Sequence, residues 1–211
     1  LYRFAHWILP KLYRLNGGWF VFGQDNVPKE GGAVVVSNHL SFLDPPVIGS
    51  ALPRRTYYFA KAELFVPVFG AIIRKCYAFP VKRGEADLAA TREAIRLLRA
   101  GELLVMFPEG TRSRDGMLQD FDLGAVLVAS RAGVPLLPTA VYGTDRVLPI
   151  GAKFPRRGKI AVSFGAPIDS QQFGPKPNKD ELAELNELVR GATAALQRSQ
   201  REFFHRPRQE G

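Results

Sequence analysis

Residues 33–46, with the sequence AVVVSNHLSFLDPP, predict how the chain folds around a single histidine. The β-branched run Ala33–Val36 is typical of a buried strand. Asp44-Pro45-Pro46 is typical of a helix start, because proline is accepted in the first helical turn. We therefore expect His39 at a strand-to-helix corner, the place where α/β proteins expose reactive groups.

His39 and Asp44 are the candidate catalytic pair of this corner. In a regular helix, a spacing of five residues would turn the two side chains well apart. At a bent corner the carboxylate can fold back onto the imidazole, fix its tautomer and stabilise its charged form. The pattern thus predicts a general base with an orienting partner. A lone histidine after a strand is more often a packed or solvated side chain, so a second motif is needed.

The second motif is Phe107–Arg114, with the sequence FPEGTRSR. Together the two stretches resemble the N-H-x4-D and F-P-E-G-T-R hallmarks of the 1-acylglycerol-3-phosphate acyltransferase family, in that order. Two further segments match the family: Lys61–Leu64, KAEL, resembles its K-x-E-L element, and Val134–Pro138, VPLLP, resembles its V-P-hydrophobic-x-P block. The resemblance spans residues 26–165.

The resemblance implies a transfer of a fatty acyl group to the sn-2 hydroxyl of 1-acylglycerol-3-phosphate, which gives phosphatidic acid. We expect the acyl donor to be a thioester of either CoA or acyl-carrier protein, which serves as co-substrate, with no further cofactor. His39 acts as the general base and Asp44 orients it, so that the hydroxyl attacks the thioester directly. A serine hydrolase would need a G-x-S-x-G elbow, which the sequence lacks.

The candidate substrate-binding residues lie in the loops that follow predicted strands: Lys61, Arg83, Glu109, Gly110, Thr111 and Arg112. Arginine matches a phosphate with its planar fork, and lysine acts as a point charge. The resemblance implies phosphate binding at Lys61 and Arg112, and Arg83 matches the family's V-x-R element. Gly110 lets a backbone N–H approach an oxyanion closely. Glu109 either shapes its loop or clamps Arg112, and we favour the clamp.

One segment departs from the family pattern. The family often carries lysine in an F-K-x-G element after its glutamate motif, but here residues 121–124 read FDLG. An acid replaces the expected cation, which leaves phosphate binding to the other basic residues and bears on the acceptor headgroup. The alternative functions are an acyltransferase for another lysolipid or glycerol-phosphate acceptor, and a non-enzymatic nucleic-acid- or lipid-binding module.

The alternation of apolar segments predicts an α/β fold. We expect strands at 19–22, 33–36, 56–60, 77–81, 103–107, 136–142 and 160–164, and helices at 1–15, 45–52, 88–99, 121–132 and 180–197. These elements should form a single layered domain, with a mostly buried central sheet flanked by helices, preceded by an amphipathic N-terminal helix. The expected divisions are a membrane-associating segment at 1–18, the acyltransferase domain at 19–198 and a basic tail at 199–211. If the strands before His39, Arg83 and Arg112 are parallel neighbours, base and cations meet at one edge.

The amino-acid composition limits the classes of molecule that the protein is expected to bind. The chain has 211 residues, 46% of them hydrophobic, which is enough for one domain with a sizeable core. Twenty-nine basic against 20 acidic residues give a net charge of +9, so nucleic acid, an anionic membrane and a phosphorylated substrate all fit. The single cysteine, Cys76, fits a reducing compartment, and dispersed histidines give no zinc spacing, so we expect no metal. With the family resemblance we expect lysophosphatidic acid, the acyl donor and a membrane surface as partners, and no nucleic acid.

The N-terminal segment predicts a membrane-surface helix. Its apolar side carries Phe4, Trp7, Ile8 and Leu12, with Arg3, Lys11 and Arg14 interspersed. A helix packed on its own domain is the alternative, and Pro10 should kink or divide it in either case. No apolar run approaches the ~20 residues of a membrane span. We therefore expect peripheral or monotopic attachment to the cytoplasmic face of the cell membrane. The apolar run 64–73 predicts a core helix broken by proline or a lining of an acyl groove.

Overall fold

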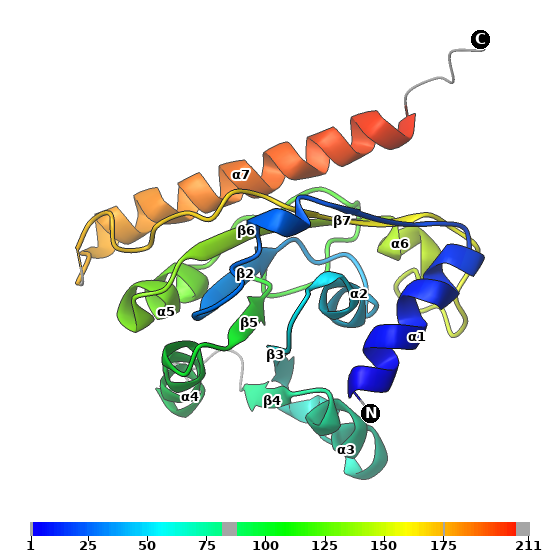
Figure 1. Cartoon of the computed structure of the whole chain (residues 1–211), viewed down its shortest axis with the longest axis horizontal. Coiled ribbons are helices and arrows are strands. Elements are labelled where there is room, and N and C mark those ends of the chain that lie inside the picture. The colour runs from blue at the N-terminus through cyan, green and yellow to red at the C-terminus, as the bar shows by residue number, and fades with distance from the viewer. Residues whose placement is uncertain (1, 82–87, 175, 206–211) are drawn as a thin grey trace.

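A seven-stranded sheet runs through the centre of the protein in the order β1-β7-β6-β2-β5-β3-β4 (Figure 1). The structure is a computed structural model and describes residues 2–81, 88–174 and 176–205. The strands are β1 (Trp19–Phe22), β2 (Ala33–Ser37), β3 (Thr56–Lys61), β4 (Ala78–Val81), β5 (Leu103–Met106), β6 (Leu136–Tyr142) and β7 (Ile160–Phe164). Neighbouring strands are parallel except β6 and β7, which are antiparallel. The predicted α/β class and central sheet are confirmed.

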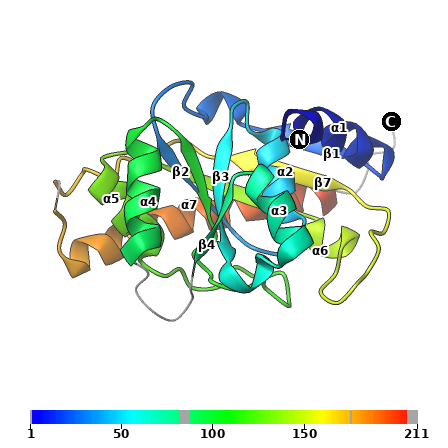
Figure 2. The same cartoon turned by 90° about the horizontal axis from the view of Figure 1, so that it is seen from below.

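Helices cover both faces of this sheet. They are α1 (Tyr2–Leu15), α2 (Asp44–Ala51), α3 (Pro67–Lys75), α4 (Leu88–Arg99), α5 (Gly124–Ala132), α6 (Thr144–Val147) and α7 (Lys179–His205), with 3-10 turns η1 (Gln24–Asn26) and η2 (Ala62–Leu64). α1 and α2 contribute to the apolar cluster on one face, and α4, α5 and α7 to the cluster on the other. Figure 2 shows α4 and α5 on one side of the strands and α1 and α2 on the opposite side.

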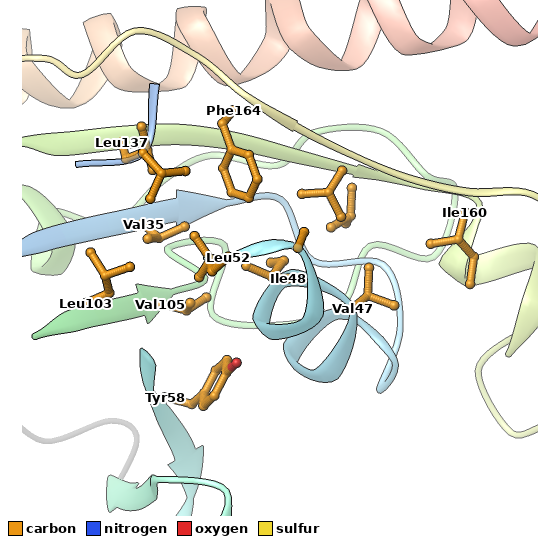
Figure 3. Packing of buried hydrophobic residues seen from close by; sticks show 14 of the residues in the cluster. Val35, Val47, Ile48, Leu52, Tyr58, Leu103, Val105, Leu137, Ile160 and Phe164 are labelled. Atoms are coloured by element: carbon orange, nitrogen blue, oxygen red, sulfur yellow. The ribbon is translucent and has the colours of Figure 1, made fainter. Parts of the chain in front are cut away.

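The strand that feeds the His39 corner is buried along its whole length. Successive β2 side chains alternate between the two faces, so Val35 joins the cluster with α2 while Val34 and Val36 join the cluster with α4 and α5. Figure 3 shows Val35 between Leu103 and Leu137 and the α2 residues. A central parallel strand covered on both faces needs a continuous apolar run, which explains its AVVV sequence. Burial of each valine stabilises the fold by roughly 1.5–3 kcal/mol. The valines therefore hold β2 firmly in the sheet, which gives the residues that follow it a defined position.

Three boundaries differ from expectation. α5 begins at Gly124 and not at 121, because the Asp122 carboxylate accepts the Gly124 N–H at 2.8 Å and starts the helix there. α7 continues to His205, past the expected end at 197, because Phe204 stacks on Tyr142 and packs edge-on against Phe20. The expected loose tail is therefore wrong for residues 199–205, and 206–211 lie outside the described residues. Pro10 does not divide α1, which is one helix.

Candidate active site

The carboxyl ends of four parallel strands lie along one edge of the sheet. β2 pairs with β5 so that Val36 lies beside Met106, and β3 pairs with β4 so that Lys61 lies beside Val81. β5 and β3 are also parallel, which joins the two pairs. The loops that follow β2 and β5, with His39 and the FPEGTR motif, therefore leave from adjacent positions. The predicted meeting of the base and the second motif at one edge is confirmed.

His39 and Asp44 are in direct contact at this edge. The His39 Nδ1 lies 2.7 Å from Asp44 Oδ2, because the chain bends between β2 and α2 and returns the carboxylate to the ring. The contact favours the tautomer whose Nδ1 carries hydrogen. His39 Nε2 has no hydrogen-bond partner among the described residues, and the side chain is 13% exposed. The ring is thus fixed at one nitrogen and open to a substrate at the other.

Asp44 is the polar anchor of the corner. Its Oδ2 also accepts the backbone N–H groups of Leu40 at 2.6 Å and Ser41 at 2.8 Å. The residue is completely buried, and within the described residues its Oδ1 has no partner. A buried carboxylate stabilises an adjacent positive charge strongly, since little water screens the pair. Asp44 therefore holds the imidazole in place at Nδ1.

The loop after β5 holds His39 from the other side. Phe107 stacks on the imidazole, with ring centroids 4.2 Å apart. The His39 backbone N–H donates to Glu109 Oε1 at 2.8 Å, and the His39 carbonyl accepts the Ser113 N–H at 2.8 Å. Both motifs therefore build one site, because the second supplies the contacts that fix the backbone and ring of the first.

Glu109 shapes this loop, and the predicted clamp on Arg112 is wrong. Its two carboxylate oxygens accept backbone N–H groups, from His39 and from Gln119 at 3.2 Å. No ion pair joins it to a described cation. Burial raises the pKa of Glu109 to about 7, although the two N–H groups oppose that rise. Whether Glu109 also touches substrate stays a prediction.

Gly110 has a left-handed backbone with φ of 66°, which glycine adopts without strain. Its N–H donates to the Phe107 carbonyl at 3.0 Å. That donor is used within the turn, and the approach of a backbone N–H to an oxyanion at Gly110 stays a prediction. Thr111, the next residue, is exposed.

The cationic side of the site has fewer described contacts. The Arg112 guanidinium lies over the Phe42 ring, 3.8 Å from its centroid. The Lys61 backbone ends β3 at the same edge of the sheet. Its side chain and the whole of Arg83 lie outside the described part of the chain. The structure thus brings Arg112 close to the corner through Phe42, and phosphate binding by the three cations stays a prediction.

Asn38 and Phe107 take part in the site in ways that the sequence analysis missed. The buried Asn38 amide donates to the Val141 carbonyl at 3.2 Å and accepts the Val141 N–H at 2.8 Å, which ties the corner to β6. A polar residue directly after a buried strand was an available signal for Asn38. The stacking of Phe107 had no such signal, because it depends on β5 being the neighbour of β2.

An apolar cavity of about 320 Å³ opens next to the corner. Its walls come from α1, α2, β3, α3 and β4, and include Phe42 and Pro45 from the corner itself. Leu64 and Ile73 also line it, so the apolar run 64–73 forms part of a cavity wall. Among the described residues, no group of three or more His, Cys, Asp or Glu side chains is placed to hold a metal ion.

The fold and the site together define a class: an α/β protein in which a histidine, held by a buried carboxylate, lies beside an apolar cavity. Comparison with known proteins agrees. The family described as Acyltransferase matches residues 19–142, more than half of the chain. The protein is 31% identical over 191 residues to a 1-acyl-sn-glycerol-3-phosphate acyltransferase of Bacillus subtilis, covering 90% of this chain and 93% of that one.

Two further relatives indicate the same family. A chloroplastic 1-acyl-sn-glycerol-3-phosphate acyltransferase of Arabidopsis thaliana is 34% identical over 83% of this chain, which spans half the length of that relative. The crystal structure of the 1-acyl-sn-glycerophosphate acyltransferase PlsC from Thermotoga maritima superposes with a TM-score of 0.80 at 28% identity, covering 95% of this chain and 79% of that one. The chain therefore belongs to the 1-acylglycerol-3-phosphate acyltransferase family, as its two motifs predicted.

Proposed function

We propose that the protein transfers a fatty acyl group from an acyl-CoA or acyl-carrier-protein thioester to the sn-2 hydroxyl of 1-acylglycerol-3-phosphate. The observation that carries the proposal is the 2.7 Å contact between His39 Nδ1 and Asp44, next to an apolar cavity whose wall includes Phe42 and Pro45. This arrangement offers a base for a hydroxyl proton and an apolar space for a hydrocarbon chain. The names of the relatives supply the acceptor.

In the proposed mechanism, His39 Nε2 takes the proton of the acceptor hydroxyl as its oxygen attacks the thioester carbonyl. The new ester C–O bond forms, the C–S bond breaks, and the imidazolium returns the proton to the departing thiolate. Asp44 stabilises the imidazolium throughout. An acyl-serine intermediate is disfavoured because Ser41 Oγ donates to the Leu148 carbonyl at 2.8 Å and Ser37 Oγ to the Asn38 carbonyl at 3.0 Å.

Substrate binding divides between two regions. We assign the acceptor's phosphate to Arg112, with Lys61 and Arg83 as further cations, because guanidinium groups bind phosphate through paired hydrogen bonds. We assign an acyl chain to the apolar cavity, whose wall includes Phe42, the residue whose ring lies under the Arg112 guanidinium. Phe42 would then lie close to both the phosphate and the chain.

The lipid substrate suggests attachment to a membrane surface through α1. Its Phe4, Trp7 and Leu15 side chains are 63%, 59% and 80% exposed, which is unusual for large apolar groups. The opposite side of the helix packs on the domain through Tyr13. Within the described residues, no helix has the length and apolar character needed to cross a bilayer. We propose that α1 lies in the headgroup region of the cytoplasmic leaflet.

Release of free thiol from acyl-CoA or acyl-carrier protein tests the function. The protein should release thiol only when lysophosphatidic acid is present, and His39→Ala should lower the rate by about 100- to 10,000-fold. Lysophosphatidylcholine and glycerol 3-phosphate serve as comparison acceptors. Equal or greater use of either would favour the related acyltransferase, and thiol release without any acceptor would overturn the transfer. Folded but inactive protein that binds nucleic acid would favour the non-enzymatic alternative.

A further inference from the structure

The segment between α6 and β7, residues 149–159, forms a closed surface loop, called the 149–159 loop below. The Arg156 N–H donates to the Val147 carbonyl at 2.7 Å and closes the loop at its base. Inside it, the Ala152 N–H donates to the Pro149 carbonyl at 3.0 Å, and Gly151 supplies the left-handed turn. A loop with its ends tied in this way holds its tip in a defined place.

The tip of this loop presents one large apolar side chain among cations. Phe154 is 80% exposed, which equals Leu15 as the highest value for a large apolar side chain among the described residues. Lys153, Arg156 and Arg157 are exposed, and none forms an ion pair with a described carboxylate. Residues 149–159 contain no aspartate or glutamate. The loop therefore joins an exposed aromatic ring to uncompensated positive charge.

Hydrogen bonds join the loop to Asn16, which directly follows α1, and join Leu148, the residue before the loop, to the catalytic corner. The Asn16 carbonyl accepts the Gly158 N–H at 3.0 Å, and the Asn16 side chain donates to the Arg156 carbonyl at 2.9 Å. Just before the loop, the Leu148 carbonyl accepts the Ser41 hydroxyl. Figure 1 shows the yellow loop beside the blue α1 at one end of the molecule. Leu15 and Phe154 thus lie on segments that are bonded to each other.

We propose that the 149–159 loop is a second membrane-contacting element, which inserts Phe154 into the interface of an anionic bilayer and places Lys153, Arg156 and Arg157 on its headgroups. The inference deepens the proposed function, since it rests on a lipid substrate reached from the membrane surface. An aromatic side chain with flanking cations suits the headgroup region. Through Ser41, the contact sets the catalytic corner at a fixed height above the lipid.

An acidic acyl-carrier protein is the competing occupant of such a basic surface. The neighbouring α1 favours the bilayer, because Leu15 and Phe154 are both 80% exposed and the loop is hydrogen-bonded to Asn16, the residue that follows α1. An acidic carrier protein would be bound chiefly through the cations, whereas a bilayer interface also accommodates the exposed Phe154 ring.

The first test follows the environment of the loop tip directly. Phe154→Cys in a Cys76→Ser background carries a polarity-sensitive fluorophore, since Cys76 is the single cysteine of the chain. Vesicles of phosphatidylcholine with phosphatidylglycerol should shift its emission to the blue. The matched control is Leu188→Cys, an exposed apolar position on α7, whose label should keep its emission. An unshifted Phe154→Cys label on vesicle-bound protein would overturn the proposal.

The second test measures partition onto the same vesicles by flotation. Arg156→Gln with Arg157→Gln should lower the partition coefficient by about fivefold per charge, from about 1 kcal/mol for each cation near an anionic surface. Phe154→Ser should lower it by a similar factor. The matched control is Arg131→Gln with Lys176→Gln, two exposed cations outside α1 and the loop, which should float as the parent does. A loop variant that floats equally well overturns the proposal, and so does a parent that never floats.

Two outcomes separate this inference from the proposed function. Flotation and emission need no turnover, so they report on the loop even if lysophosphatidic acid is not the acceptor. If the charge variants float normally but need more acyl-carrier protein for half-maximal rate with a short, water-soluble lysophosphatidate, the loop docks the carrier and the membrane proposal is wrong. An inactive parent with a blue-shifted loop would refute the acyl transfer alone.

Discussion

The His39–Asp44 corner is held in place by more contacts than the Arg112 side of the site. At the corner, the imidazole has a carboxylate at 2.7 Å, a stacked ring and two bonded backbone groups. Arg112, by contrast, rests on the face of Phe42. Its guanidinium makes no ion pair with a described carboxylate.

This difference indicates where the substrate completes the site. A base must be oriented before the reaction, because small displacements of a proton acceptor cost rate. A phosphate brings its own charge and its own acceptor oxygens, so it can order an arginine that is loosely held. Changes at the corner should therefore lower kcat, and changes at the cationic side should mainly raise KM for the phosphorylated acceptor.

Among the substitutions that test this difference, Asp44→Asn should have the largest effect, and it should act on kcat. Asp44 Oδ2 alone contacts His39 Nδ1 and the Leu40 and Ser41 N–H groups. An amide oxygen in its place keeps these contacts but lacks the charge that stabilises imidazolium. An NH₂ in its place would lose both backbone hydrogen bonds, reverse the tautomer and place the hydrogen on Nε2. We expect kcat to fall on the order of a thousandfold, measured by thiol release at saturating acceptor.

The matched control for that change is Asp120→Asn, an exposed carboxylate in the loop after β5 that pairs with Arg190 and does not contact His39. Its kcat should stay within about twofold of the parent, as expected for a weak surface ion pair. If Asp44→Asn also kept parental kcat, with an unchanged fold by circular dichroism, the corner would not act as a base with its partner.

Arg112→Ala should have the next largest effect, and it should weaken the binding of lysophosphatidic acid. Loss of a charge-assisted contact costs roughly 1.5–3 kcal/mol, or about ten- to a hundredfold in KM for lysophosphatidic acid. Arg112→Lys should recover part of this loss, because it keeps the charge and loses the fork. A lysolipid without the phosphomonoester provides the comparison. If both acceptors suffered equally, Arg112 would support the loop and would not read the phosphate.

Particular residues show how much of the fold and of the site could be predicted from the sequence. The alternation of strands and helices, the bent corner and the contact of His39 with Asp44 followed from local pattern, since turns and buried strands have local signatures. The role of Glu109 did not. Its two partners are backbone N–H groups of residues 39 and 119, and only the pairing of β2 with β5 brings the first of them near. Phe107 was missed for the same reason. Asn38 had a local signal, its place directly after a buried strand, but its partner Val141 lies on β6.

Glu109 is partly buried beside the His39 backbone, and its pKa of about 7 gives a test with a defined sign. Its ordinary value is 4.5, so the folded protein holds the proton more tightly than the unfolded chain. That contribution to stability is complete below pH 4.5 and is lost as pH rises through about 7. Glu109→Gln cannot titrate, so the free-energy difference between parent and variant should shift in the variant's favour across this window.

Denaturant unfolding of both proteins at a series of pH values measures this shift. Glu93→Gln is the control, because the Arg96 guanidinium lowers the pKa of that exposed carboxyl. A parent whose stability relative to Glu109→Gln rose between pH 4.5 and 7 would show that the two N–H bonds outweigh burial. Glu109 would then be an ordinary ionised carboxylate.

The smallest expected effect is that of Phe42→Leu, which tests the one described contact of the Arg112 guanidinium. Leucine keeps an apolar wall for the cavity but removes the ring face under the cation. An exposed cation–π contact contributes about 0.5–1 kcal/mol, so KM for lysophosphatidic acid should rise about two- to fivefold while kcat stays near the parental value.

A double-mutant cycle decides whether this rise acts through Arg112. In the parent, Arg112→Lys loses both the fork and its stacking on Phe42, whereas in Phe42→Leu only the fork remains to be lost. Arg112→Lys should therefore raise KM less in the Phe42→Leu background than in the parent. Strict additivity would mean that Phe42 and Arg112 act separately. The guanidinium would then owe its position to the phosphate alone, which would widen the contrast with the preorganised base.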